Sequence, residues 1–246
     1  MSTLCEIKIF MQKIVLIQSL FIILVMFGLS IQKAQATIEI GYRAGVWLNA
    51  GKLNSIIQEY NAQNPWQKFN KVHFGLGGRG VIGFQSENFN IFAGLKWLRN
   101  TQTSSGTDPS TLTNNSKRLV VHYGGIIFGM QTNSESIVNA GFEFNAFNYY
   151  VLSFQESTIS NVKSAARTEI INNVNPDLSL FLRFALQKGK AGISLIPALD
   201  LPIFHGRNDI SDLRKQWKLY APSDAKVMRG YNFSITLSVL LGKSRD

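Results

Sequence analysis

The end of the chain, residues 228–243, constrains the fold most. It reads MRGYNFSITLSVLLGK, in which apolar residues alternate with small or polar ones. Successive side chains of a strand point to opposite faces, so one face of this segment is apolar and the other polar. About ten residues of such alternation is the length that a tilted strand needs to cross a bilayer. The segment is therefore predicted to be a membrane-spanning strand, and its lipid-facing residues are Tyr231, Phe233, Ile235, Leu237, Val239 and Leu241.

Seven upstream segments show the same alternation, which makes about eight strands in all. The mean hydropathy is +0.03 and the chain contains 17 Phe. This near-neutral average argues against several long apolar helices and fits strands whose two faces cancel. The seven segments are 38–48, 72–84, 89–97, 119–129, 138–154, 178–187 and 191–203.

The connections between these segments alternate in length. Short turns are expected at 86–88, 132–136 and 188–190, and long polar loops at 50–70, 101–116, 155–175 and 205–226. This alternation is typical of an all-β, transmembrane, antiparallel up-and-down β-barrel with short periplasmic turns and long extracellular loops. We expect the last strand to close the ring by pairing with 38–48, and the Ser-, Thr- and Asn-rich loops to be mobile.

The first long loop has a helical pattern. Leu53, Ile56, Ile57 and Tyr60 recur at helical spacing, which predicts a short amphipathic helix over 53–61. Such a helix could lie across the barrel mouth, lie on the outer head groups, or only pack its own loop down. In the last long loop, residues 209–220 mix charges with apolar side chains and are expected to be locally ordered.

The N-terminus has the features of an export signal. Lys13 precedes an apolar run over 14–31, and Ala34-Gln35-Ala36 follows. We therefore expect a cleaved signal peptide over 1–36 and a barrel domain over 37–246. Met11 is an alternative start that would leave 1–10 as an extension, and an uncut membrane anchor is the alternative to cleavage.

Composition excludes several kinds of chemistry. Cys5 is the single cysteine and precedes the export segment, so the mature chain would have no thiol for disulfides, catalysis or metal binding. The formal net charge is +10, but the Lys and Arg residues are scattered singly. No nucleic-acid partner is expected, and contact with lipid head groups or another anionic surface is favoured.

With these features, the chain resembles the small outer-membrane β-barrel proteins of Gram-negative bacteria, and most closely the OmpA/OmpX-type barrels of Bacteroidetes. The resemblance implies a monomer in the cell outer membrane, in contact with lipopolysaccharide and inserted by the barrel-assembly machinery. Many such barrels end on an aromatic residue that this machinery reads. The present chain instead ends in LGKSRD, and its nearest aromatic residues are Tyr231 and Phe233.

The inward face of the predicted barrel is charged. An eight-stranded barrel has an interior that side chains about fill, so buried charges must pair with one another. Five cations facing three carboxylates predict an ion-paired plug, and the surplus positive charge leaves a narrow anion conduit or a small-ligand pocket as the alternative. The predicted network is Glu39, Arg43, Arg79, Lys96, Arg118, Glu143, Arg183 and Asp200, and His73, His122 and Asn145 are also expected inside.

Catalysis has weak support in the sequence. A lipid-modifying barrel enzyme would need a histidine beside a serine and a carboxylate. His205 is the candidate, with Asp209, Ser211 and Asp212 following, but their spacing does not require this arrangement. No cofactor or metal is predicted, since two inward histidines without matched carboxylates are weak evidence for a metal site. The sequence therefore favours a non-enzymatic barrel with a structural or surface-interaction role.

Overall fold

The structure is a computed structural model of the chain, and it describes most of the predicted barrel domain. The predicted signal peptide falls outside the described residues except for Gln35 and Ala36, which begin the first strand. The described residues are 35–48, 50–85, 89–132, 137–158, 166–174, 176–188, 191–203, 211–219 and 231–242.

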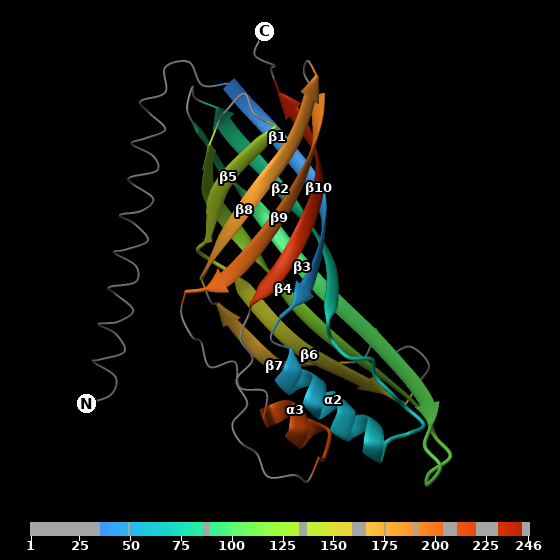
Figure 1. The fold of residues 1–246 in the computed structure, drawn as a ribbon. Helices are drawn as coiled ribbons and strands as arrows, with labels where there is room; N and C mark the ends of the chain where they lie inside the picture. Colours follow the sequence, from blue (N-terminus) through green and yellow to red (C-terminus); the bar gives the residue numbers. More distant parts are fainter. Residues whose placement is uncertain are drawn as a thin grey trace, which may run out of the picture.

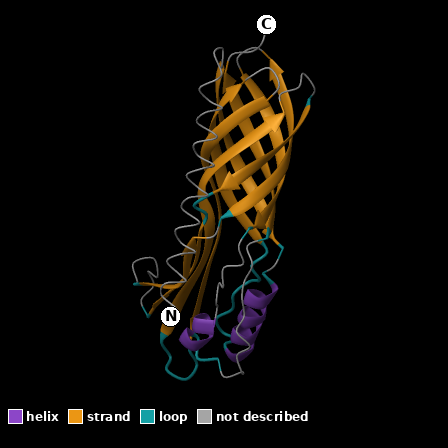
Figure 2. Ribbon diagram, turned by 90° about the vertical axis from the view of Figure 1, so that its left-hand side faces the viewer, coloured by secondary structure: helices purple, strands orange, loops and turns teal. Residues whose placement is uncertain are grey.

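Eight antiparallel strands form a closed ring, as the alternation predicts (Figures 1 and 2). Each strand pairs with its two neighbours, and the pairing of β3 with β4 completes the ring. The eight strands are β1 (Gln35–Trp47), β2 (Phe74–Gln85), β3 (Phe89–Thr107), β4 (Asn114–Thr132), β5 (Val138–Asn145), β8 (Asp177–Lys188), β9 (Ala191–Pro202) and β10 (Asn232–Gly242).

The first and last strands meet, which confirms the predicted closure. β1 and β10 pair without interruption from Thr37 with Gly242 to Trp47 with Asn232. Along β10, buried and exposed side chains alternate in step with the sequence pattern. Leu237 is 59% exposed whereas its neighbour Thr236 is 2% exposed. The polar face therefore points into the barrel and the apolar face points outward, where lipid would lie.

The sheet continues beyond the ring as four strands, which we call the outer sheet. β3 and β4 are 19 residues long, and β6 (Tyr149–Ser157) and β7 (Arg167–Val174) extend the sheet in the order β3-β4-β6-β7. The prediction of mobile loops over 101–116 and 155–175 is therefore wrong for most of their described residues. These Ser-, Thr- and Asn-rich segments form strands of the outer sheet, and the turn between β3 and β4 shortens to 108–113.

The predicted strand over 138–154 is two strands. β5 ends at Asn145 and β6 begins at Tyr149, so three residues separate them where the paired strand β4 has two, Gly125 and Ile126. This one-residue excess is a β-bulge, and it reverses the face to which alternate side chains point. Even-numbered residues consequently face outward on β5, whereas on β6 the even-numbered residues Tyr150, Leu152 and Phe154 join the buried cluster beneath α2.

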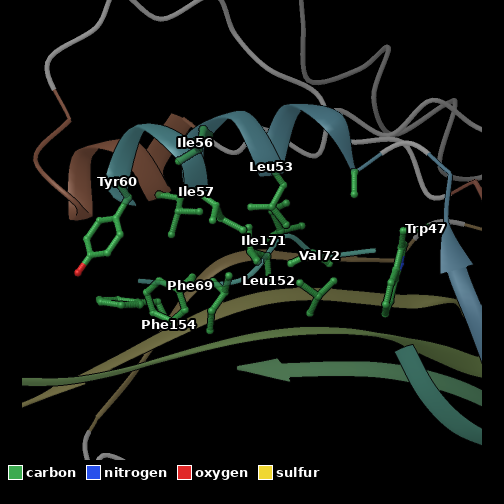
Figure 3. Close-up of a cluster of buried hydrophobic side chains, with 14 of the residues drawn as sticks. Trp47, Leu53, Ile56, Ile57, Tyr60, Phe69, Val72, Leu152, Phe154 and Ile171 are labelled. Atoms are coloured by element: carbon green, nitrogen blue, oxygen red, sulfur yellow. The ribbon is translucent and has the colours of Figure 1, made fainter. Parts of the chain in front are cut away.

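Two helices cover one face of this outer sheet (Figure 3). α2 (Gly51–Gln63) is the predicted amphipathic helix, extended by two residues at each end, and α3 (Ser211–Gln216) lies beside it (Figure 1). The helix therefore packs on a sheet rather than on head groups. The buried cluster between them includes Leu53, Ile56, Ile57, Tyr60, Phe69, Val72, Leu119, Val121, Leu152, Phe154, Ile171, Leu213 and Trp217.

None of the helices in the described part of the chain is long and apolar enough to cross a membrane.

Aromatic contacts and an ion pair join the helices to the outer sheet and to each other. The ring of Trp217 stacks on Phe69 at 5.4 Å and lies 4.5 Å from Tyr60. Arg214 on α3 pairs with Glu59 on α2 at 2.6 Å. We call the outer sheet with α2 and α3 the outer domain, and it has an apolar core of its own.

The depth of the outward face in the bilayer is testable on β10. Leu237→Arg places a charge near the midplane and should destabilise the folded barrel by about 2–4 kcal/mol. Leu241→Arg, on the same face near the strand end, should cost only about 0–1 kcal/mol. Equilibrium unfolding in urea from lipid vesicles measures both values. Equal costs at the two positions would contradict a lipid-facing belt.

Candidate functional site

Lys96 is the centre of the charged cluster in the barrel interior. Its Nζ lies 3.2 Å from carboxylate oxygens of Glu143 and Asp177 and 2.9 Å from Asp200. It also donates a hydrogen bond to the hydroxyl of Ser179. These partners come from β5, β8 and β9. The side chain of Lys96 is 0% exposed, so one buried cation joins the carboxylates of three other strands.

The two aspartates have further donors near the outer end of the barrel. The Arg43 guanidinium on β1 pairs with Asp200, and Asn232 Nδ2 donates to the same carboxylate over 2.9 Å. Asn148 Nδ2, in the bulge before β6, donates to Asp177 over 2.6 Å. Buried carboxylates with several charge-assisted hydrogen bonds are fixed in place, so this end of the interior is filled by a connected polar network.

Glu39 is the centre of a second group nearer the predicted periplasmic end. Arg79 and Arg183 each approach its Oε2 at 3.6 Å. Its Oε1 accepts hydrogen bonds from the hydroxyls of Ser194, at 2.6 Å, and Ser238. All five side chains are buried. The carboxylate therefore connects β1 with β2, β8, β9 and β10.

Arg79 joins the two groups and lies between aromatic rings. Its Nε and Nη2 donate to Glu143 Oε2 over 3.1 and 3.0 Å. Its guanidinium carbon lies 5.0 Å from the Phe92 ring centre and 5.9 Å from that of Phe181, within the range of cation–π attraction. A Cβ at Gly129 would overlap the Phe92 ring, so glycine is required there for the ring to fill the interior.

Apolar side chains cover the outer end of this polar interior. Trp47, Leu98 and Tyr123 point inward, are buried, and belong to the cluster beneath α2. Trp47 ends β1, whereas Leu98 and Tyr123 lie in the middle of β3 and β4. The Tyr123 hydroxyl still donates to Asp177 over 3.2 Å. A Cβ at Gly75 would overlap the Trp47 ring, so only glycine leaves room for the indole at this position. The outer domain's core thus continues directly into the barrel mouth.

Seven of the eight predicted network residues lie in the interior and pair with one another. Arg118 does not, because it lies on the outer half of β4 and donates to Gln155 over 3.3 Å. Asp177 is the member that sequence reasoning missed. The interior of the described barrel therefore holds four cations and four carboxylates, which are Arg43, Arg79, Lys96 and Arg183 against Glu39, Glu143, Asp177 and Asp200.

The histidines expected inside the barrel are elsewhere. His73 is exposed and precedes β2, and His122 lies on the outer sheet with Arg118. Asn145 is buried in the interior, as predicted. His205 and Asp209 fall outside the described residues, and the Asp212 carboxylate pairs with Lys215 at 2.7 Å. Across the described residues, no cluster of His, Cys, Asp and Glu could hold a metal ion.

Neither a protein-family model nor a curated protein matches the sequence. Among solved structures, the chain is similar to Ail, the attachment invasion locus protein of Yersinia pestis, in a complex with the heparin analogue sucrose octasulfate. That match has 8% identity and a TM-score of 0.40, and it covers 86% of this chain and 99% of that chain. The chain is also similar to Neisserial surface protein A, with 5% identity, a TM-score of 0.36, and coverage of 84% and 96%.

The molecule's own architecture places it in a bilayer. Its ring leaves no unpaired edge, its outward face is apolar, and its interior is polar and charged. A hydrocarbon environment requires the closed ring and the apolar outward face, and water requires neither of them. The described residues therefore form a membrane-spanning, eight-stranded β-barrel.

Removing the central cation should unfold the barrel more easily. Lys96→Met leaves the buried Asp177 carboxylate without a cation and removes one of the cations that Glu143 and Asp200 contact, so the free energy of unfolding should fall by about 3–5 kcal/mol. Lys215→Met, which breaks an exposed ion pair, should cost less than about 1 kcal/mol. Urea titration in detergent or vesicles measures both. A cost below about 1 kcal/mol for Lys96→Met would show that the network does not stabilise the fold.

Proposed function

We propose that this protein is a closed, non-conducting barrel that anchors a rigid domain on the cell surface. The observation that carries the proposal is the continuity between the filled interior and the apolar core of the outer domain. In this view the barrel supplies membrane attachment, and the outer domain makes the contacts in which the function lies.

The charge balance supports a plug rather than an anion conduit. The predicted surplus of interior cations is the reason to consider a conduit. The structure has no such surplus, because Arg118 lies outside the interior and Asp177 lies within it. Ions crossing the barrel would also have to pass the apolar layer at Trp47 and Tyr123. Desolvating an ion between tightly paired charges and apolar side chains is costly.

A lipid-modifying activity has no comparable support. Asp212, one of the acids proposed to orient His205, already pairs with Lys215. The deeply buried carboxylates of the interior are bound by cations and hydroxyls, so they are not available as a general base for a lipid substrate. Lipopolysaccharide and the barrel-assembly machinery remain the partners that we expect, with a monomer as the expected state.

Electrical recording tests the closed interior. The refolded mature protein, inserted in a planar bilayer, should give no discrete conductance steps under an applied voltage. The reason is that side chains fill the interior from the level of Glu39, nearer the periplasmic end, to the level of Trp47 at the outer end. A general porin reconstituted in the same bilayers is the positive control. Reproducible unitary steps at frequencies that scale with the amount of protein would show that the barrel conducts.

The outer domain differs from ordinary barrel loops in having its own packed core. Its sheet contributes Leu119, Val121, Leu152 and Phe154, and the helices close over them. The Gln67 amide donates to the backbone carbonyls of Ser104 and Asn115, at 3.3 and 2.8 Å. The segment after α2 is thereby tied to the far ends of β3 and β4. This packing supports a surface of fixed shape, which suits specific recognition better than mobile loops do.

Cysteine labelling tests which end of the barrel faces outward. The natural cysteine, Cys5, lies in the predicted signal peptide, so single-cysteine variants of the mature chain are clean probes. Gln58→Cys, on the exposed side of α2, should react with a membrane-impermeant maleimide on intact cells. Ala191→Cys, beside a short turn, should react only after the envelope is opened. The reverse pattern would place the outer domain in the periplasm and refute the proposed role.

A further inference from the structure

The outer sheet has a second face, opposite to the helices, that carries clustered cations. Leu152 and Phe154 point toward α2 (Figure 3), and Tyr150 belongs to the same buried cluster. Strand alternation therefore places the intervening residues of β6 on the other side. The strand register brings basic residues together there. Arg99 pairs with His122 across β3 and β4, and Gln155 lies between its partners Arg118 and Arg167. We call this surface the basic face, defined by Arg99, Arg118, His122 and Arg167.

The arginines are held on this face by neutral neighbours. Arg99 Nε donates to Thr101 over 2.9 Å, and Arg118 Nη1 donates to Gln155 over 3.3 Å. The Arg118 Nε is buried and has no hydrogen-bond partner among the described residues. These contacts orient the guanidinium groups without neutralising them.

The cations of the basic face lie close enough to repel one another. Burial, Arg118 and Arg167 lower the pKa of Arg99. Burial, Arg99 and Arg167 lower the pKa of His122. Glu169 pairs with Arg167 at 3.6 Å, so among the described residues three guanidinium groups share this face with one carboxylate. An anionic ligand would relieve the repulsion.

The basic face begins where the lipid-facing surface ends. Trp97 and Tyr149 form the last aromatic row of the outward face, both aligned with Gly124 of β4. Aromatic rows of this kind lie at the membrane–water interface. Arg99 follows Trp97 by two residues on the same face, which is about 7 Å further along the strand. This position is at the level of the lipid head groups.

We propose that the basic face binds the phosphate groups of lipid A, the phosphorylated glycolipid of the outer leaflet. Guanidinium groups bind phosphate oxygens in pairs. Arg118 and Arg167 lie four residues further along the strands than Arg99, so the face offers cations at two levels to a head group that carries more than one phosphate. The face is continuous with the lipid-facing surface, so a lipid phosphate is its natural source of negative charge. The inference rests on the proposed outward orientation of the outer domain and names the site of the expected contact with lipopolysaccharide, but it does not depend on whether the barrel conducts.

A binding experiment with charge-matched variants tests the inference. The test variant is Arg99→Gln, Arg118→Gln and Arg167→Gln combined. The control variant, Lys52→Gln, Lys68→Gln and Lys71→Gln combined, removes the same charge from exposed positions outside the basic face. Each refolded protein, in zwitterionic detergent, is titrated with purified lipopolysaccharide, with its dephosphorylated form, and with inorganic phosphate. Heat-modifiable gel mobility confirms that both variants fold.

The expected result is a loss of affinity for lipopolysaccharide of at least about tenfold in the arginine variant, given what each cation contributes near an anionic surface. The control variant should stay within about twofold of the wild type, and dephosphorylation should weaken wild-type binding as strongly as the arginine changes do. Equal losses in the two variants, unchanged binding by the arginine variant, or equal binding of the dephosphorylated form would overturn the proposal. Inorganic phosphate that binds as tightly as lipopolysaccharide would overturn the lipid assignment.

Discussion

Hydrogen bonding of every backbone group within the bilayer is the constraint on which this structure depends. Hydrocarbon offers no partner to an open strand edge, so the sheet must close, and the pairing of β1 with β10 completes that requirement. Closure with eight strands leaves a narrow interior that side chains must fill. Because the sequence places charges there, they must neutralise one another. The contacts of Lys96 and Glu39 with groups from the surrounding strands follow from that need.

The same sheet has to reverse its hydrophobic face where it leaves the membrane. Within the membrane, apolar side chains of the sheet point outward to lipid. In the outer sheet, beyond the membrane, they point toward α2. β4 makes the change in its sequence, since Ile126 and Phe128 are outward whereas Val121 and Tyr123 are inward. In the neighbouring segment, β5 and β6, the apolar pattern stays on even-numbered residues. The bulge at 146–148 instead turns the backbone, so that these residues face lipid on β5 and α2 on β6.

This reversal explains how much of the fold could be predicted from the sequence. Period-2 alternation identifies the eight ring strands and their closure, because lipid imposes that pattern directly. It cannot identify the outer halves of β3 and β4, where both faces are polar or the apolar phase changes. Assuming that the apolar residues Leu119, Val121 and Tyr123 face lipid places Arg118 inside. The change of the apolar pattern from Ile126 to Tyr123 is the signal that corrects this assignment. Asp177 is not identified as an interior residue because it lies one residue before the predicted strand, which begins at Leu178.

The barrel and the outer domain depend on each other through a few shared residues. Asn148 lies in the bulge that turns β6 toward α2, and its amide also donates to Asp177 in the interior network. Tyr123 packs in the outer core while its hydroxyl donates to the same carboxylate. Loss of either donor would leave a buried carboxylate less well bonded and would loosen the contact between the two cores. The outer domain is therefore held as an extension of the barrel interior, which gives its exposed surfaces a fixed orientation relative to the membrane.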